Sequence, residues 1–267
     1  MTGRKQAIKP PVVDIVQPTS ADASSAGVPK RDGSQAANSV DDAPTVPPRH
    51  ALPPSVIHEL RTPLTSIHGY AQVLQRTLRD VPRAVNATAV IARESVRLSE
   101  MLSLLSELSE LDHGEPSAAP IEVEVGQIVE GIAQEVARRD ARAHPINVTG
   151  SARAVCNPTL LSRAMLHILT NAVRYSEEGQ PVTVTIGRAG TSVEILVEDA
   201  GMGIFPADDD RVYGVFERGS NAREAGIRGL GLGLYLAQQA IMQTGGHILH
   251  QATPTGGTVF RVLLPAA

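Results

Sequence analysis

The sequence predicts a multidomain α and α+β protein in which a helical hairpin precedes an α/β sandwich. Two observations lead to this prediction. Between about residues 51 and 113, apolar side chains recur at helical spacing through long segments that a proline-containing turn separates. From about residue 121 onward, short β-branched segments and helical segments follow one another in irregular order. This order is typical of one mixed sheet with helices on one of its faces.

Residues 1–50 lack the pattern of a folded domain. Ala, Ser, Asp and Pro dominate this segment, and the first aromatic residue of the chain is Tyr70. A segment of this composition buries too little apolar surface to offset the entropy of its chain. We therefore expect a disordered N-terminal tail, with a docking peptide or a regulated linker as the alternatives.

The first long helix is expected from about Ala51 to Arg79, with prolines in its first turn. Its apolar residues alternate steps of three and four, which is the spacing of a coiled-coil seam. They are Ile57, Leu60, Leu64, Ile67, Ala71, Leu74 and Leu78.

His58 and Thr62 are expected one turn apart on the opposite, outward face of this helix, with Glu59 beside the histidine. An imidazole, a hydroxyl and a carboxylate then meet on a surface that water reaches. Pro63 follows directly, where it removes a helical hydrogen bond and bends the backbone. The zinc-protease motif needs a second histidine where Thr62 stands, so that class is excluded.

The second helix is expected to follow a turn at residues 80–82, with Pro82 in its first turn, and to stop near Gly114. Its apolar residues are Ile91, Leu98, Met101, Leu102, Leu105 and Leu108. Two antiparallel helices cannot cover both apolar seams alone. We therefore expect residues 51–113 to form a homodimer that is a four-helix bundle. Residues 114–120 are then a linker.

Residues 121–267 are expected to form the α/β sandwich. The predicted strands are 121–125, 145–149, 182–187, 192–198, 246–251 and 258–264. The predicted helices run from about residue 125 to 139, from 158 to 174 and from 232 to 244.

The composition excludes several classes of protein. A net charge of −4 at pH 7 carries no general signature of nucleic-acid binding. The single cysteine, Cys156, excludes an intrachain disulfide and any multi-thiolate metal site, and it fits a reduced cytosolic setting. Neither a membrane-spanning apolar run nor an apolar signal core is present. We expect a cytoplasmic protein with no nucleic-acid partner and no membrane insertion.

The run His-Glu-Leu-Arg-Thr-Pro-Leu, residues 58–64, resembles the phosphoacceptor box of two-component sensor histidine kinases. Three further boxes of that family follow in the expected order, and the resemblance covers about residues 55–264. It implies a dimerisation and phosphotransfer hairpin and a catalytic domain with the ATP-binding fold shared by histidine kinases, Hsp90, gyrase and MutL.

Asn171 lies late in the predicted helix 158–174, where asparagine has poor helix propensity. Its spacing alone also suits a C-terminal cap. Resemblance to the family's N box implies instead that its amide oxygen binds Mg²⁺, which prefers oxygen ligands. The same resemblance implies that Arg174 lies near the phosphates and Tyr175 beside the nucleotide. His167 departs from the family, which usually has a second asparagine there.

Asp199, Gly201 and Gly203 are similar to the family's Asp-x-Gly-x-Gly box. The resemblance implies that the Asp199 carboxylate accepts a hydrogen bond from the adenine amino group. The two glycines would let the backbone approach the base. Ala200 replaces an asparagine that is frequent in the family.

Residues 204–228 are long, polar and contain glycine, as expected of a mobile lid over a ligand. By resemblance to the family's phenylalanine-rich box, Arg218 is a candidate phosphate contact, although Gly214 stands where a glutamate is usual. Alternating glycines then open a helix, which frees backbone amides to meet phosphate oxygens. They are Gly229, Gly231 and Gly233. Leu230 replaces a common threonine.

The resemblance implies an ATP-dependent protein-histidine kinase that uses Mg²⁺ and phosphorylates itself on His58. Glu59 would orient or deprotonate the imidazole. The phosphoryl group would pass to an aspartate in the receiver domain of a response regulator. Thr62 matches the position that places water for dephosphorylation of that regulator. Whether a separate sensor protein supplies the input is open.

Two alternatives remain. The first is a kinase-impaired phosphatase, for which His167, Gly214 and Leu230 are the support. The second is an ATP-binding dimeric scaffold that phosphorylates nothing. The pair of His58 and Glu59 weighs against the second, since a scaffold needs neither.

Overall fold

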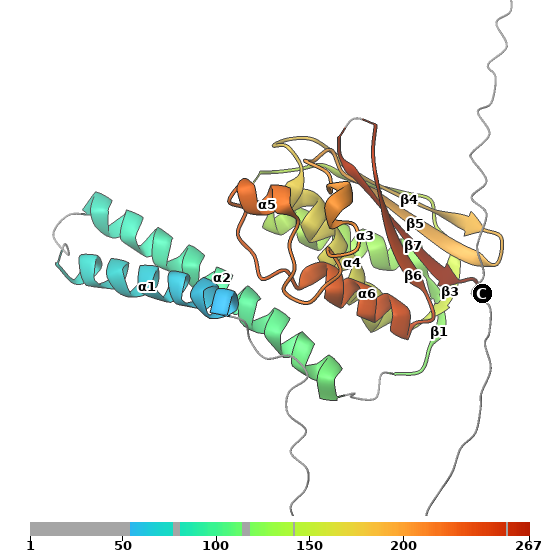
Figure 1. The fold of residues 1–267 in the computed structure, drawn as a ribbon, viewed down its shortest axis with the longest axis horizontal. Helices are drawn as coiled ribbons and strands as arrows, with labels where there is room; N and C mark the ends of the chain where they lie inside the picture. Colours follow the sequence, from blue (N-terminus) through green and yellow to red (C-terminus); the bar gives the residue numbers. More distant parts are fainter. Residues whose placement is uncertain (1–53, 77–80, 114–117, 141, 255) are drawn as a thin grey trace, which may run out of the picture. The chain divides into compact units, whose positions relative to one another are not determined.

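The computed structural model describes residues 54–76, 81–113, 118–140, 142–254 and 256–267 (Figure 1). The expected tail, residues 1–50, and part of the expected linker lie outside the described residues. The helices are α1 (Pro54–Arg76), α2 (Val81–His113), α3 (Val125–Arg139), α4 (Pro158–Tyr175), the 3-10 helix η1 (Pro206–Asp208), α5 (Ser220–Glu224) and α6 (Gly233–Gln243). The strands are β1 (Ile121–Glu124), β2 (Ile146–Thr149), β3 (Arg153–Cys156), β4 (Val182–Ala189), β5 (Ser192–Glu198), β6 (His247–Ala252) and β7 (Thr258–Pro265).

Helices α1 and α2 pack against each other as the predicted hairpin. Pro82 lies in the first turn of α2, as expected, and α1 continues through Pro63. The packing of the hairpin covers the predicted seam only in part, because Leu60, Ile67, Ala71 and Leu74 are half-buried. Ile57 is 47% exposed and Leu64 is 58% exposed, whereas Val56 is buried. One copy of the hairpin therefore leaves Ile57 and Leu64 of its seam exposed to water.

The main sheet has the order β2-β4-β5-β7-β6. Strands β2 and β4 are parallel, and every other neighbouring pair is antiparallel. The predicted mixed sheet is confirmed. Strand β3, four residues long, was not predicted. It pairs with β1 in a separate two-stranded sheet.

Helices α3, α4 and α6 cover one face of the main sheet (Figure 1). Buried residues alternate with more exposed ones along β4, β5 and β7, which is the pattern of a strand with one covered face. The apolar residues that α4 turns toward the core are all buried: Leu161, Ala164, Met165, Ile168, Leu169, Ala172 and Val173. The core between sheet and helices therefore fixes both the rotation of α4 and the ends of the strands.

The predicted lid contains short helices that the sequence reading missed. Asp208, at the end of η1, is buried and accepts hydrogen bonds from the backbone N–H and the hydroxyl of Ser220, at 2.7 and 2.6 Å. These bonds cap the start of α5 and tie it to η1. Farther along the lid, Tyr213 lies 3.1 Å from His250 Nδ1 on β6. No helix within the described parts of the chain is both long and apolar enough to cross a membrane.

Candidate functional site

Helix α4 brings Asn171 and Arg174 to one side of a pocket. Asn157 caps the start of this helix by accepting from Thr159 and Leu160, and the helix ends at the cap residue Ser176. Asn171 is therefore not a C-terminal cap, and that alternative is wrong. Its amide lies beside Gly233, where an added Cβ would be 3.6 Å from Nδ2.

The Asp199 carboxylate is buried at the end of β5 and is held from one side. Its Oδ1 accepts from the backbone N–H groups of Gly201 and Thr258, at 3.0 and 3.1 Å. No described residue donates a hydrogen bond to Oδ2, and Asp199 lines the pocket. Burial raises the pKa of Asp199 to about 6, against the lowering effect of these two N–H groups. The carboxylate is thus a preformed acceptor with one oxygen left for a ligand.

Two glycines in this site are required by close contacts of the backbone. At Gly203, φ is +67° and an added Cβ would collide with the carbonyl oxygen of Gly256. At Gly231, φ is +70° and an added Cβ would collide with the backbone of Glu217. A side chain at either position would be strained and would push two segments of the pocket wall apart.

The pocket collects residues from four distant stretches of the sequence. It is lined by nine of the predicted nucleotide-binding residues: Asn171, Arg174, Tyr175, Asp199, Gly203, Arg218, Gly229, Gly231 and Gly233. Gly201 does not line it; its role is to donate to Asp199 and to pass close to the carbonyl of Tyr175.

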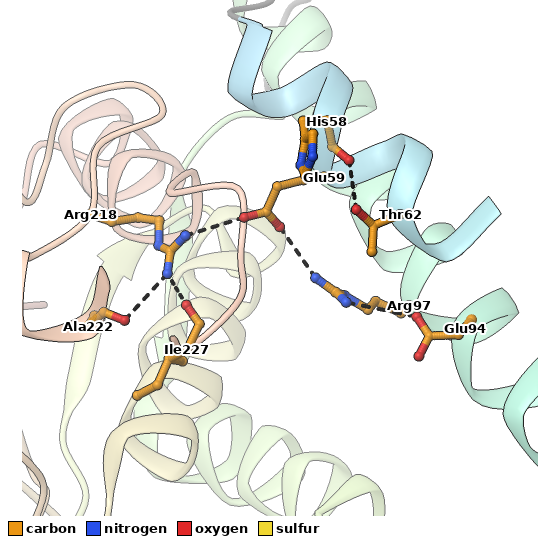
Figure 2. Close-up of polar contacts among 8 residues, drawn as sticks. All are labelled: His58, Glu59, Thr62, Glu94, Arg97, Arg218, Ala222 and Ile227. Carbon is orange, nitrogen blue, oxygen red and sulfur yellow. Dashed lines mark hydrogen bonds and ion pairs between the residues drawn. The ribbon is translucent and has the colours of Figure 1, made fainter. Parts of the chain in front are cut away.

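His58 lies on α1 with its side chain exposed to water, as predicted. Within the described part of the chain, the ring makes no hydrogen bond or ion pair. The Thr62 hydroxyl donates to the His58 carbonyl oxygen at 3.0 Å, one turn back along the helix (Figure 2). The ring is therefore free to meet a ligand, while the threonine hydroxyl has a local partner that it would leave to bind water.

Glu59 is held between two guanidinium groups (Figure 2). Arg97 of α2 lies 3.3 Å from Oε2, and Arg218 of the lid lies 3.3 Å from Oε1. Arg218 also donates to the carbonyl oxygens of Ala222 and Ile227, but its Nε–H is buried without a hydrogen-bond partner. Leaving a buried donor without a hydrogen-bond partner costs free energy. The Nε–H of Arg218 is therefore available to donate to a ligand in the pocket.

His167 lines the pocket, but its Nε2 lies 2.8 Å from the carboxylate of Glu107 on α2. One turn earlier on α4, Arg163 pairs with Glu110 at 2.9 Å. The residue that departs from the expected motif is therefore bound to the hairpin. The carboxylate of Glu107 on α2 is the hydrogen-bond partner of the His167 ring. Sequence spacing could not reveal this contact.

Comparisons with known proteins follow the same division of the chain. Residues 55–114 match the His Kinase A (phospho-acceptor) domain. Residues 156–267 match the histidine kinase-, DNA gyrase B-, and HSP90-like ATPase family, whose domain binds ATP. The chain belongs to the sensor histidine kinase family.

Curated relatives agree with this assignment. The sensor-like histidine kinase SenX3 of Mycobacterium tuberculosis is 32% identical over 218 residues, which cover 79% of this chain and 52% of the relative. The signal transduction histidine-protein kinase/phosphatase MprB of Mycobacterium avium is 32% identical over 225 residues, covering 78% of this chain and 41% of the relative. The chain spans about half the length of the curated relatives it matches.

A solved structure supports the fold. The Acinetobacter baumannii histidine kinase AdeS has a TM-score of 0.55 at 21% identity, covering 78% of this chain and 97% of that one. The predicted fold is confirmed, and the two family matches are the domains expected of a histidine protein kinase.

Several pocket residues of this histidine kinase were missed by sequence reasoning. Thr258 holds Asp199 through its backbone N–H, and Asn221 donates to the carbonyl oxygens of Met202 and Gly203. Leu104 of α2 also lines the pocket. Thr258 is the first residue of the predicted strand 258–264, whereas nothing local in the sequence marked Asn221 or Leu104.

The donor chemistry of the pocket fits Mg²⁺ that arrives with a nucleotide. Among the described residues, no group of three or more His, Cys, Asp or Glu side chains could hold a metal ion. Asn171 offers one amide oxygen, a ligand type that Mg²⁺ accepts. Mg²⁺ also tends to keep several waters and to bind substrate phosphates, so one protein oxygen is consistent with this ion.

Proposed function

We propose that this chain is an ATP-dependent protein-histidine kinase that phosphorylates itself on His58. The observation that carries the proposal is the convergence of four sequence segments on one pocket, beside a hairpin with an exposed phosphoacceptor histidine. The family of the chain is consistent with this activity.

In the nucleotide complex, the free Oδ2 of Asp199 accepts from the adenine amino group. Backbone amides around Gly231 and Gly233, at the start of α6, donate to phosphate oxygens. Arg174 and Arg218 line the same pocket and neutralise phosphate charge. Asn171 would hold Mg²⁺, which supplies further charge neutralisation when bound.

The chemical step forms one bond and breaks one. An unprotonated ring nitrogen of His58 attacks the γ-phosphorus of ATP in line with the bridging oxygen. The P–N bond forms while the bond from phosphorus to that oxygen breaks, and the electron pair leaves with ADP. Glu59 accepts the hydrogen bond of the other ring nitrogen and takes up its proton, so the phosphorylated ring is left without the extra positive charge.

The phosphoryl group then passes to an aspartate in a response regulator. We assign the same surface a phosphatase role, with Thr62 placing the attacking water. The exposed seam on α1 supports a homodimer, because Ile57 and Leu64 need a second copy to leave water.

A labelling experiment tests the proposal. The purified protein is incubated with Mg²⁺ and ATP labelled at the γ-phosphate, and acid-labile, base-stable label is expected. His58→Gln should abolish the label and leave nucleotide affinity unchanged. The matched control is His68→Gln, an exposed histidine on the same helix that pairs with Gln72. Label that survives His58→Gln would contradict the assignment.

A kinase-impaired phosphatase is the second candidate. His167 binds Glu107 and offers no amide oxygen to Mg²⁺. If the protein binds ATP but takes up no label, while it removes phosphate from a phosphorylated regulator, this second function is the correct one.

A further inference from the structure

Four charged side chains form a continuous line across the hairpin and the lid (Figure 2). Glu94 and Arg97 lie on α2, Glu59 on α1 and Arg218 in the lid. Arg97 Nη1 lies 3.8 Å from Glu94 Oε2, and Arg97 Nη2 lies 3.3 Å from Glu59 Oε2. Arg218 Nη1 lies 3.3 Å from Glu59 Oε1. Each oxygen of the Glu59 carboxylate therefore faces a different guanidinium.

These contacts are shielded from water. The side chains of Glu59 and Arg97 are 20% and 19% exposed, and that of Glu94 is 12% exposed. Fully exposed ion pairs order a side chain weakly, because water and salt screen them. Here the surroundings screen less, so two opposing guanidinium groups hold Glu59 in one place. A glutamate without them would sample several rotamers.

The two arginines differ in what else they touch. Arg218 lines the nucleotide pocket, and it also binds carbonyl oxygens of its own lid segment. Arg97 does not line the pocket; its contacts are with carboxylates of the hairpin. Arg97 can therefore act on the phosphoacceptor through Glu59 without acting on nucleotide binding.

We propose that Arg97 is a positioning residue for the phosphorylation of His58, because its guanidinium holds the carboxylate of Glu59, the residue that follows the phosphoacceptor. Arg218 shares this carboxylate from the lid. The inference rests on the proposed function, in which Glu59 orients the imidazole. With Arg97 in place, Glu59 already occupies one position before the nucleotide binds. Less conformational entropy is then lost in reaching the reactive geometry.

The test separates the rate of the step from nucleotide binding. Arg97→Gln removes the charge at similar size and should lower kcat for autophosphorylation roughly 10- to 100-fold, with KM for ATP unchanged within about twofold. Arg97→Lys keeps a charge but loses the fork of donors, so its kcat should be intermediate. The matched control is Arg93→Gln, one turn earlier on α2, where the guanidinium pairs with Glu94. This control should label like the unmodified chain.

A double variant shows whether Arg97 works through Glu59. Glu59→Gln alone should lower kcat, and adding Arg97→Gln should lower it no further. A further loss of kcat of the same size in the double variant would overturn the inference. So would a folded Arg97→Gln whose kcat is unchanged, whether or not its KM is raised.

Circular dichroism melting and light scattering establish that each variant is folded and dimeric. If Arg97→Gln melts below the assay temperature, kcat and KM are measured on Arg97→Lys instead. A kcat of Arg97→Lys equal to that of the unmodified chain then shows that Arg97 has a purely structural role. Absence of label in the unmodified chain would reject the proposed function itself, which is a different result.

Discussion

Asp199 is held by backbone amides on one oxygen and is free on the other, which makes it the most specific recognition group in the pocket. Asp199→Asn keeps the shape but presents a donor or a neutral acceptor to the adenine amino group. We expect nucleotide affinity to fall by about 1.5–3 kcal/mol, the size of a charge-assisted hydrogen bond. Titration calorimetry measures this loss, and unchanged affinity would reduce Asp199 to a turn residue.

The raised pKa of Asp199 gives a pH dependence whose sign can be stated. Burial raises this pKa from 3.8 to about 6, so the free protein loses a stabilising contribution as pH rises through this interval. Nucleotide binding needs the ionised carboxylate, so affinity should rise as pH increases through about 6.

Binding near pH 6 should therefore release a proton from Asp199. Calorimetry in two buffers of different ionisation enthalpy measures the release. Asp199→Asn at the same pH is the control, because protons lost by the nucleotide itself are common to both proteins. Equal proton release from the unmodified chain and from Asp199→Asn would show that Asp199 is already ionised in the free protein.

Thr62 separates the two activities that we propose. Its hydroxyl now donates to the His58 carbonyl, a bond within the helix that alanine can lose at little cost. Thr62→Ala should leave autophosphorylation within about twofold and slow regulator dephosphorylation roughly tenfold, which corresponds to about 1.4 kcal/mol. Time courses with a phosphorylated receiver domain measure the second rate. An equal loss of both activities would make Thr62 a structural support for the helix around Pro63.

At the scale of elements, α4 serves three purposes with different faces. One face is buried in the core, one carries Asn171 and Arg174 into the pocket, and Arg163 and His167 pair with carboxylates of α2. Arg163 and His167 are one turn apart, and their partners Glu110 and Glu107 are three residues apart. The two pairs are therefore in register between neighbouring helices.

Replacing His167 with asparagine tests whether the histidine at this position weakens Mg²⁺ binding. His167→Asn breaks the pair with Glu107 and adds an amide oxygen one turn from Asn171. We expect the Mg²⁺ concentration for half-maximal autophosphorylation to fall roughly fivefold, the effect of about 1 kcal/mol. Glu107→Gln is the control, because it removes the ionised partner and adds no oxygen to the pocket. A similar fall in both variants would attribute the effect to the α2 contact.

At the scale of the whole molecule, the exposed seam residues Ile57 and Leu64 of the hairpin predict a dimer interface. Leu64→Asp places a charge where a second copy should pack. Each copy would lose a buried leucine worth about 1.5–3 kcal/mol, so the dimer should weaken roughly 100-fold or more. Analytical ultracentrifugation measures the association. Thr65→Asp adds the same charge at a neighbouring exposed position and should leave the dimer intact; equal weakening would indicate another interface.

The sequence predicted those parts of the fold that depend on local periodicity. The hairpin, helix α4 and strand β5 were found because helices and strands repeat their apolar residues at fixed intervals. Strand β3 and helix α5 were missed: β3 forms by pairing with β1 in a separate sheet, and the five-residue α5 is held at its start by Asp208. The boundaries of the predicted tail and linker stay predictions.

The candidate residues of the pocket were identifiable because they lie in motifs with their own chemistry: an asparagine late in a helix, a carboxylate at the end of a strand and alternating glycines. Their meeting in one pocket was decided by the packing of α4, β5 and α6 around a common core. Tertiary structure alone placed Arg97 and Arg218 on either side of Glu59 and Glu107 beside His167. Ion pairs of this kind join residues that no periodicity connects, because their distances depend on how whole elements pack.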